Sequence, residues 1–234
     1  MKKETLYEGF DKVLKHTKED HIDNVITAIM SSNPVTSVFG SFVDNYLPKG
    51  RQQRLEDFIR DFAVGYENFK DKMQIELAKI KTDSFSFIFV NVIQSALIYY
   101  QPEKIEAFRA ILLNSLTPES PSDELKEYYL NLLNSLTPVH IKILKAVKIP
   151  QKFHYEAGYP DDGTYIKILE PMFEFKLKPY PNDLIKSAWR ELLSKGLVKE
   201  EKIEASASTV KAINIKGMLT EFGQGFIDFI VLEK

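Results

Sequence analysis

Few of the side chains that do chemistry in proteins stand at spacings that could build a reactive site. His16 and His21 are five residues apart, so they do not share one helix face as two metal ligands four residues apart would. The densest polar cluster surrounds the turn at residues 160–163 and consists of His154, Glu156, Asp161 and Asp162. A general base or a divalent-metal site could be drawn there. Aspartate and glycine are also what such a turn requires, so we favour an exposed turn without a metal.

Other sequence signatures of catalysis are missing. The chain has no cysteine, which excludes a thiol nucleophile, a disulfide framework, an iron–sulfur cluster and cysteine-ligated zinc. It also lacks a glycine-rich phosphate loop, a Gly-x-Ser-x-Gly elbow and a His-Glu-x-x-His motif. His140 falls in the first turn of an expected helix, where packing or a hydrogen bond at the helix start is the favoured role. We therefore expect no enzyme, no cofactor and no metal, and we identify no small-molecule substrate.

The composition is that of a soluble globular protein. The 234 residues include 31 Lys and Arg against 33 Asp and Glu, which gives a net charge of −2, and 44% are hydrophobic. This balance provides no chain-wide attraction for nucleic acid or anionic lipid. Residues 1–18 lack the apolar core of an export signal, and neither end carries a lipidation motif. We expect a cytoplasmic location.

Helical periodicity dominates the first 147 residues. Apolar residues within 35–47 and within 55–73 recur at intervals that place them on one helix face. The heptapeptide Leu-Leu-Asn-Ser-Leu-Thr-Pro occurs twice, at Leu112–Pro118 and Leu132–Pro138, and we interpret each copy as a helix end followed by Thr-Pro. Helices are expected over 35–47, 55–73 and 84–102, and then from Pro102, from Ser122 and from Pro138.

Two features could bring the chain to a membrane. The nineteen residues Ser84–Pro102 carry no formal charge, but polar residues interrupt them and the dense apolar run is too short for a hydrocarbon core of about 30 Å. Because a helix that is apolar on all sides is normally core, we expect a buried central helix of a bundle. The basic cluster Lys49, Arg51 and Arg54 could touch lipid phosphate, although a solvated helix start is favoured.

The elements of the last hundred residues are punctuated by proline and glycine. A short helix is predicted over Thr164–Phe173 and a cleaner one after residue 182, which Gly196 can end in the left-handed conformation. Thr209–Leu219 is predicted as a strand, and Thr220 should cap a closing helix. This order resembles a winged helix-turn-helix domain, and the matching segments are Leu136–Leu144, Ala188–Val198 and Leu219–Gly223.

In winged helices that read DNA, the outer face of the third helix enters the major groove. The candidates for nucleic-acid binding are Lys186, Ser187, Arg190 and Lys211. Two acidic residues flank the basic pair, however, and residues 136–234 hold 15 Lys and Arg against 13 Asp and Glu, a net charge of only +2. Because non-specific DNA affinity comes mostly from neutralised phosphates, this surface is poorly equipped for DNA. Winged helices also serve as protein-interaction modules, and we favour that role.

The middle of the chain resembles uncharacterised bacterial helical proteins. The segments concerned are Pro102–Leu116, Glu124–Leu125 and the Leu-Thr-Pro-x-His helix start at 136–140. This layout is similar to that of the abortive-infection alpha family, whose helical region also leads into such a terminal helix. The resemblance implies a link to phage defence, and it brings no catalytic motif with it.

The sequence therefore predicts a mainly α fold, with a helical bundle over residues 1–135 and a winged-helix-like domain with a small β-hairpin over residues 136–234. The expected function is that of a non-enzymatic bacterial interaction protein. Its bundle would serve self-association or a protein partner, and its winged helix a partner or DNA. Two alternatives stay open, a DNA-binding transcriptional regulator and a membrane-acting defence effector that uses residues 84–102 or 35–47.

Overall fold

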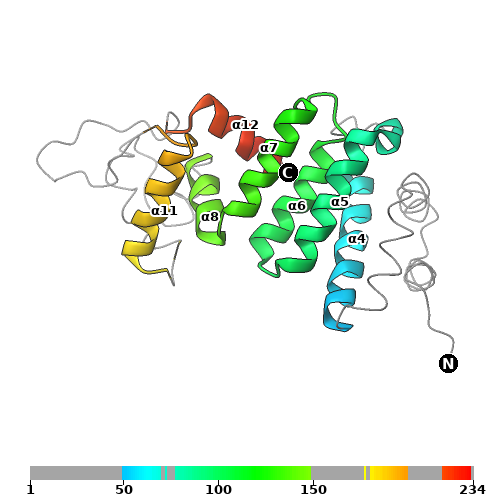
Figure 1. The fold of residues 1–234 in the computed structure, drawn as a ribbon, viewed down its shortest axis with the longest axis horizontal. Coiled ribbons are helices and arrows are strands. Elements are labelled where there is room, and N and C mark those ends of the chain that lie inside the picture. Colours follow the sequence, from blue (N-terminus) through cyan, green and yellow to red (C-terminus); the bar gives the residue numbers. More distant parts are fainter. Residues whose placement is uncertain are drawn as a thin grey trace, which may run out of the picture. The chain divides into compact units, whose positions relative to one another are not determined.

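The computed structural model describes residues 49–69, 72, 77–148, 177, 180–199 and 218–232. This part of the chain is mainly α-helical (Figure 1), as predicted, with seven α-helices, one 3-10 helix and a single β-bridge between Val198 and Leu219. The described residues divide into two compact units. The first holds those up to Asn134 together with Phe229–Leu232, and the second holds those of Ser135–Asp228.

Within residues 77–148 the helices follow one another with short connections. The first unit contains α4 (Lys49–Phe69), the 3-10 helix η1 (Leu77–Lys81), α5 (Asp83–Ile98), α6 (Pro102–Asn114) and α7 (Asp123–Ser135). The second contains α8 (Pro138–Lys148), α11 (Asn182–Ser194) and most of α12 (Glu221–Ile230). The helices predicted over 35–47 and 164–173, and most of the predicted strand over 209–219, lie outside the described residues.

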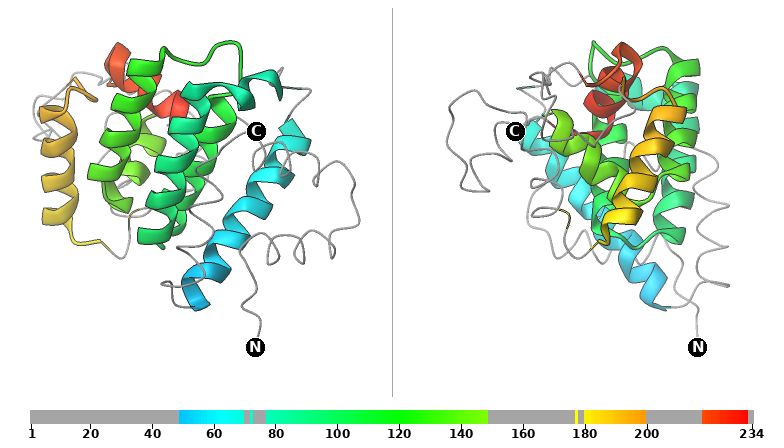
Figure 2. Two further views of the ribbon diagram at one scale, coloured as in Figure 1. Left: turned by 45° about the vertical axis from the view of Figure 1, so that its right-hand side comes forward. Right: turned by 90° about the vertical axis from the view of Figure 1, so that its left-hand side faces the viewer.

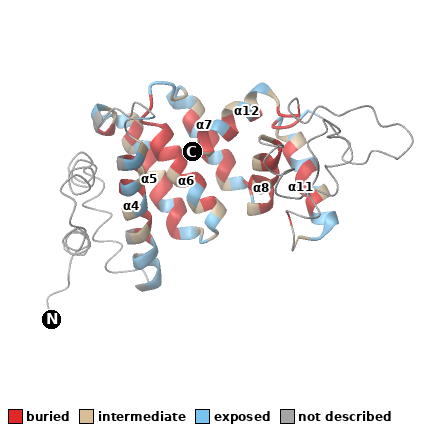
Figure 3. Ribbon diagram, turned by 180° about the vertical axis from the view of Figure 1, so that it is seen from behind, coloured by how far each residue is buried: buried red, intermediate tan, exposed pale blue. Residues whose placement is uncertain are grey.

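Helices α4, α5 and α6 pack side by side around the apolar core of the first unit (Figure 2). The predicted apolar stripe of α4 is confirmed, because Leu55, Phe58, Phe62 and Tyr66 are all buried while the opposite face meets solvent (Figure 3). Thr82 starts α5, and its hydroxyl oxygen accepts the backbone N–H of Phe85 at 3.2 Å. Such a cap satisfies an amide that has no partner within the helix.

The uncharged stretch from Ser84 forms the helix that the sequence predicts, although α5 ends at Ile98. Eight of its residues are buried in the first unit, which confirms its place in a core. The expectation that it would be buried on all sides is wrong for one face, because the side chains of Phe87 and Ile98 are 47% and 68% exposed.

Both copies of the repeated heptapeptide end a helix, as interpreted from the sequence. In the second copy α7 ends at Ser135 and Pro138 begins α8, whereas in the first copy α6 ends at Asn114 and a longer turn precedes α7. The asparagine of each copy makes a long-range contact. The Asn114 side chain donates to the carbonyl oxygen of Phe229 at 2.8 Å, and the Asn134 carbonyl oxygen accepts from two side chains described below.

In the second unit, α11 is amphipathic and packs against α8. Ile185, Ala188, Trp189 and Leu192 are buried at the predicted helical spacing. Gly196 follows the helix with φ of +69°, the left-handed conformation predicted for it, and Leu197 and Val198 then return to the core. Lys148 of α8 has its Nζ 2.6 Å from a carboxylate oxygen of Asp228 in α12.

Candidate functional site

The outer side of α11 carries three of the four residues predicted for nucleic-acid binding. Ser187 and Arg190 are exposed and Lys186 is half-buried, and their spacing places them opposite the buried Trp189 face. Lys211, the fourth candidate, lies outside the described residues. Lys186 and Arg190 are one helical turn apart, so the structure brings the two cations to one exposed surface, which we call the α11 face.

Glu191, an acidic residue next to the α11 face, contacts a side chain of α8. Glu191 places Oε2 3.1 Å from Nε2 of His140, a buried residue of α8. The alignment is poor for a hydrogen bond, so the contact is mainly electrostatic. The sequence gives no sign of this pairing, because 51 positions separate the two residues.

The other ring nitrogen of His140 closes the first turn of α8, in agreement with the role predicted for it. Its Nδ1 accepts the backbone N–H of Thr137 at 3.1 Å and lies 2.7 Å from the Thr137 hydroxyl. Because a backbone N–H can only donate, Nδ1 is the acceptor and Nε2 carries the proton. The order hydroxyl, imidazole, carboxylate matches a nucleophile with its base, but here the ring is engaged by the helix start and is poorly aligned with Glu191.

The Leu-Thr-x-x-Gly segment joins the start of α12 to the chain just after α11. Thr220 caps α12 as predicted, since its hydroxyl oxygen accepts the N–H of Gly223 at 2.8 Å. The same hydroxyl donates to the carbonyl oxygen of Gly196 at 2.6 Å. A Cβ at position 223 would lie only 2.0 Å from the carbonyl oxygen of Leu197. Gly223 therefore permits a backbone approach that no other residue type allows.

Close to Gly223, the residues just before and just after the segment 200–217 pair with each other. Val198 and Leu219 form an antiparallel bridge, and the Lys199 N–H donates to the Met218 carbonyl oxygen at 2.8 Å. On the far side of the bridge, the Thr220 N–H donates to the Leu197 carbonyl oxygen at 3.2 Å. The segment in which the hairpin is predicted thus leaves and returns at adjacent points.

The first unit contains a buried lysine that sequence reasoning missed. Lys104 is only 2% exposed, and its Nζ donates to the carbonyl oxygen of Asn134 at 3.0 Å and lies 3.4 Å from the centre of the Tyr99 ring. The Tyr99 hydroxyl donates to the same carbonyl oxygen at 2.9 Å. The Ser95 hydroxyl donates a hydrogen bond to the side-chain oxygen of Asn134 at 2.9 Å. Burial lowers the pKa of Lys104 to about 8, because removal from water disfavours the charged amine.

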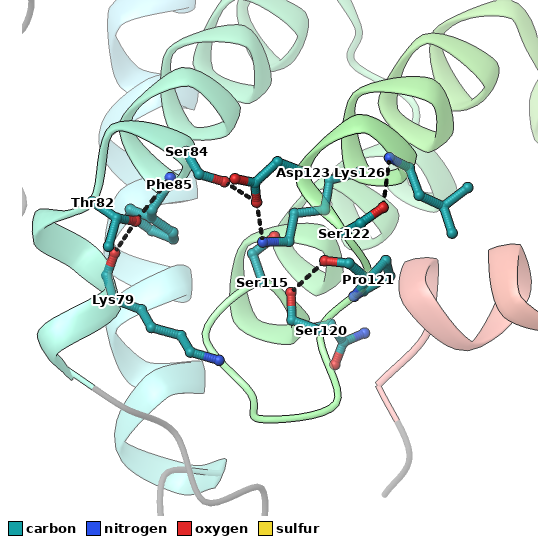
Figure 4. Close-up of polar contacts among 12 residues, drawn as sticks. Lys79, Thr82, Ser84, Phe85, Ser115, Ser120, Pro121, Ser122, Asp123 and Lys126 are labelled. Carbon is teal, nitrogen blue, oxygen red and sulfur yellow. Dashed lines mark hydrogen bonds and ion pairs between the residues drawn. The ribbon is translucent and has the colours of Figure 1, made fainter.

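A second polar cluster links the starts of α5 and α7 (Figure 4). The Ser84 hydroxyl donates to a carboxylate oxygen of Asp123, and Nζ of the largely buried Lys126 donates to the same oxygen at 3.0 Å. These two hydrogen bonds, with the positive charge of Lys126, lower the pKa of the Asp123 carboxyl. Because hydrogen bonds to the ionised form stabilise it, the cluster favours a charged Asp123 at the start of α7.

The Asp123→Asn variant should be less stable than the wild type at neutral pH, and the difference should vanish in acid. The native pKa is depressed, so the contribution of Asp123 to stability is present above the unfolded-state pKa and is lost as the pH falls through the native value. Asp123 is exposed and solvent screens it, so we expect a small effect. Urea unfolding of both proteins from pH 7 down to pH 3 measures it, and a difference that does not change with pH would contradict this assignment.

Metal and membrane sites receive no support from the described part of the chain. No group of three or more His, Asp or Glu side chains there could hold a metal ion. His16, His21 and the cluster from His154 to Asp162 lie outside that part. Among the helices that the structure describes, none has the length and apolar character needed to cross a bilayer.

No family model, curated protein or solved structure matches the chain.

Proposed function

We propose that the chain is a non-enzymatic interaction protein. Its helical bundle serves self-association or the binding of a protein partner, and its second unit is a winged-helix-like module that contacts a protein partner through the α11 face. The observation that carries this proposal is the exposed, mixed-charge α11 face, which stands on a fully buried apolar base around Trp189. A rigid helix with a solvated outer face is the usual recognition element of such modules.

The arrangement of the second unit supports the winged-helix interpretation. Its described helices α8, α11 and α12 follow one another in the predicted order, while the helix predicted over 164–173 lies outside the described residues. Gly196 turns the chain from α11 into the residues that pair across the Val198–Leu219 bridge. The Thr220 cap and the close approach at Gly223 give the Leu-Thr-x-x-Gly segment a defined structural role. The wing itself would be residues 204–208, which lie outside the described residues.

The character of the α11 face favours a protein over DNA as its partner. Arg190 and Lys186 are its cations and Asp183 lies on the same side, while Leu184, at 44% exposed, lies on another side of α11. Protein interfaces combine exposed apolar residues and arginine with few other charges at the centre. Duplex affinity instead rises with the number of phosphates neutralised, and two cations neutralise few.

A DNA-binding regulator is the second candidate, and one contact favours it. The carboxylate of Glu191, one of the two acidic residues that flank the basic pair, also contacts Nε2 of His140 in α8, at 3.1 Å. Lys186 and Arg190 could then meet phosphates or a guanine edge. A role in phage defence rests on the family resemblance alone, and so does the third candidate, a membrane-acting effector.

The double variant Lys186→Glu/Arg190→Glu should lose partner binding while the fold is retained. Its matched control is Arg51→Glu/Arg54→Glu, which makes the same reversal at two exposed positions of α4. In a pull-down from the lysate of the native cells, the wild type and the control should retain the same amount of partner protein. The double variant should retain at least tenfold less. Helix content by circular dichroism should be the same in all three proteins.

The same variants separate the candidates. Low-salt duplex retention that the Lys186/Arg190 variant loses and the control keeps would replace the protein-partner proposal with the DNA regulator. Flotation of the wild type with anionic vesicles would support the membrane effector, and the Arg51/Arg54 variant would then float less. If protein retention is equal for all three proteins, the α11 face is not the contact surface.

A further inference from the structure

One face of α5 is apolar at its ends, amidic at its centre and open to solvent. It consists of Phe87, Asn91, Gln94 and Ile98, which are exposed except for the half-buried Asn91. No charged residue lies between Asp83 and Glu103. Ile98 and the following Tyr100 are 68% and 70% exposed, the two largest values among the exposed large hydrophobic residues. We call the four residues Phe87, Asn91, Gln94 and Ile98 the α5 seam.

The spacing of the α5 seam is that of a helix-pairing surface. Its members are separated by four, three and four positions, the alternation that aligns side chains along one contact line between two helices. A polar residue at one such position is a known determinant of register and partner number. Asn91 and Gln94 hold that place here, at the middle of the seam.

The order of the seam residues makes it complementary to itself in the antiparallel direction. Reversed, the sequence apolar, amide, amide, apolar reads the same, so Phe87 would face Ile98 of a second copy and Asn91 would face Gln94. Within its own helix the Asn91 side-chain nitrogen donates to the carbonyl oxygen of Phe87 at 2.8 Å. Each amide group carries two N–H donors and an acceptor oxygen, so Asn91 keeps its oxygen and one N–H for the Gln94 amide across a two-fold axis. Isologous contacts of this kind are the commonest form of self-association.

The charges at the helix ends also select the antiparallel arrangement. Parallel pairing would set Asp83 beside Asp83 of the other copy and align the helix dipoles in one direction. Antiparallel pairing about the middle of the seam places the two aspartates about 28 Å apart along the helix axis, at a rise of about 1.5 Å per residue. A lipid surface is the poorer occupant, since α5 carries no basic residue and its one charged residue is Asp83, whereas membrane-surface helices carry basic residues on their polar face.

We propose that α5 is the self-association helix of this protein, and that two copies pair antiparallel through Phe87, Asn91, Gln94 and Ile98. This inference specifies the surface for the self-association named in the proposed function. It does not depend on the α11 face, so failure of one does not decide the other.

A charge-swap series tests the proposal. Phe87→Lys and Ile98→Glu, each alone, should weaken the dimer at least tenfold in dissociation constant, measured by analytical ultracentrifugation. The double variant Phe87→Lys/Ile98→Glu should regain dimerisation, because antiparallel pairing places each lysine opposite a glutamate. Tyr128→Lys, at a 57% exposed position of α7, is the matched control and should leave the dimer intact. All three positions that are changed are exposed, so folding should be preserved, and circular dichroism checks this.

Three outcomes would overturn the inference. A wild type that stays monomeric up to millimolar concentration has no such interface. Loss of the dimer in the double variant as well as in both single variants would indicate parallel pairing, which sets like charges together. Flotation of the wild type, but not of Phe87→Lys, with neutral phosphatidylcholine vesicles would show that the seam faces lipid.

Discussion

Replacement of Gly223 by alanine should unfold the second unit or lower its free energy of unfolding by about 3 kcal/mol or more, the upper end of the range for overpacked sites. The added Cβ would lie 2.0 Å from the carbonyl oxygen of Leu197 and 2.8 Å from its carbonyl carbon. Both are backbone atoms, so no side-chain rotation relieves the clash. If α12 moves away instead, the Thr220 hydroxyl loses its bond to the Gly196 carbonyl.

Two other glycines provide the comparison. A Cβ at Gly50, in the first turn of α4, meets nothing within 4 Å, so Gly50→Ala should be neutral or stabilising by up to about 1 kcal/mol. At Gly65 the nearest atom is Cδ1 of Leu113 at 3.0 Å, a side-chain tip that can shift. Gly65→Ala should therefore fall between the other two.

The measurement can be confined to the second unit. Trp189 is the only tryptophan of the chain and is fully buried in α11, so its fluorescence during urea unfolding reports on that unit, whereas far-ultraviolet circular dichroism reports on all helices. In Gly223→Ala the fluorescence transition should move to lower urea. Coincident transitions for Gly223→Ala and Gly50→Ala would show that α12 does not approach Leu197 as described.

This closure illustrates which parts of the fold local sequence determines. Thr220 as a cap and Gly196 as a left-handed helix end follow from rules that involve only neighbouring residues, and both were predicted correctly. Gly223 was noted only as part of a resemblance, because its role depends on a backbone segment 26 positions earlier in the chain. Periodicity cannot report how closely two distant segments approach.

The candidate site divides in the same way. The exposure of Ser187 and Arg190 follows from the amphipathic spacing of α11, since the buried face leaves only one side for solvent. The contact between His140 and Glu191 needed the packing of α8 against α11. The exposed seam of α5 was missed because the absence of charge was interpreted as burial on every side, whereas Asn91 and Gln94 mark a solvent-facing stripe.

Lys104 is the clearest case of a residue whose sequence context misleads. It stands between Glu103 and Glu106, at the start of a helix, which is typical of an exposed position. In the fold it lies 2% exposed against Tyr99 and the end of α7. The Nζ of Lys104 lies at the carbonyl end of α7, where the helix dipole stabilises a positive charge. Its removal from water has the opposite effect and disfavours the charged amine.

The stability of the wild type should therefore rise between pH 8 and pH 10.5 relative to that of Lys104→Met. The pKa of Lys104 is about 8 in the fold, against 10.5 for a lysine exposed to water, so over this interval the unfolded chain binds more protons than the native one, and stability increases with pH. The gain should be at most about 3 kcal/mol. The neutral amine keeps its N–H donor for the Asn134 carbonyl, so the hydrogen bond survives while the unfavourable burial of charge disappears.

The test compares the urea midpoints of the two proteins at about pH 7.5, 8.5, 9.5 and 10.5. The two proteins differ only at position 104, so the difference between their midpoints reports on that residue. Lys199→Met, which removes an exposed lysine, should keep the rise seen in the wild type. Lys104→Arg should remove it, because arginine stays charged throughout, and should be the least stable of the four at high pH. Parallel curves for the wild type and Lys104→Met would mean that the amine titrates as in water and that Asn134 and Tyr99 do not enclose it.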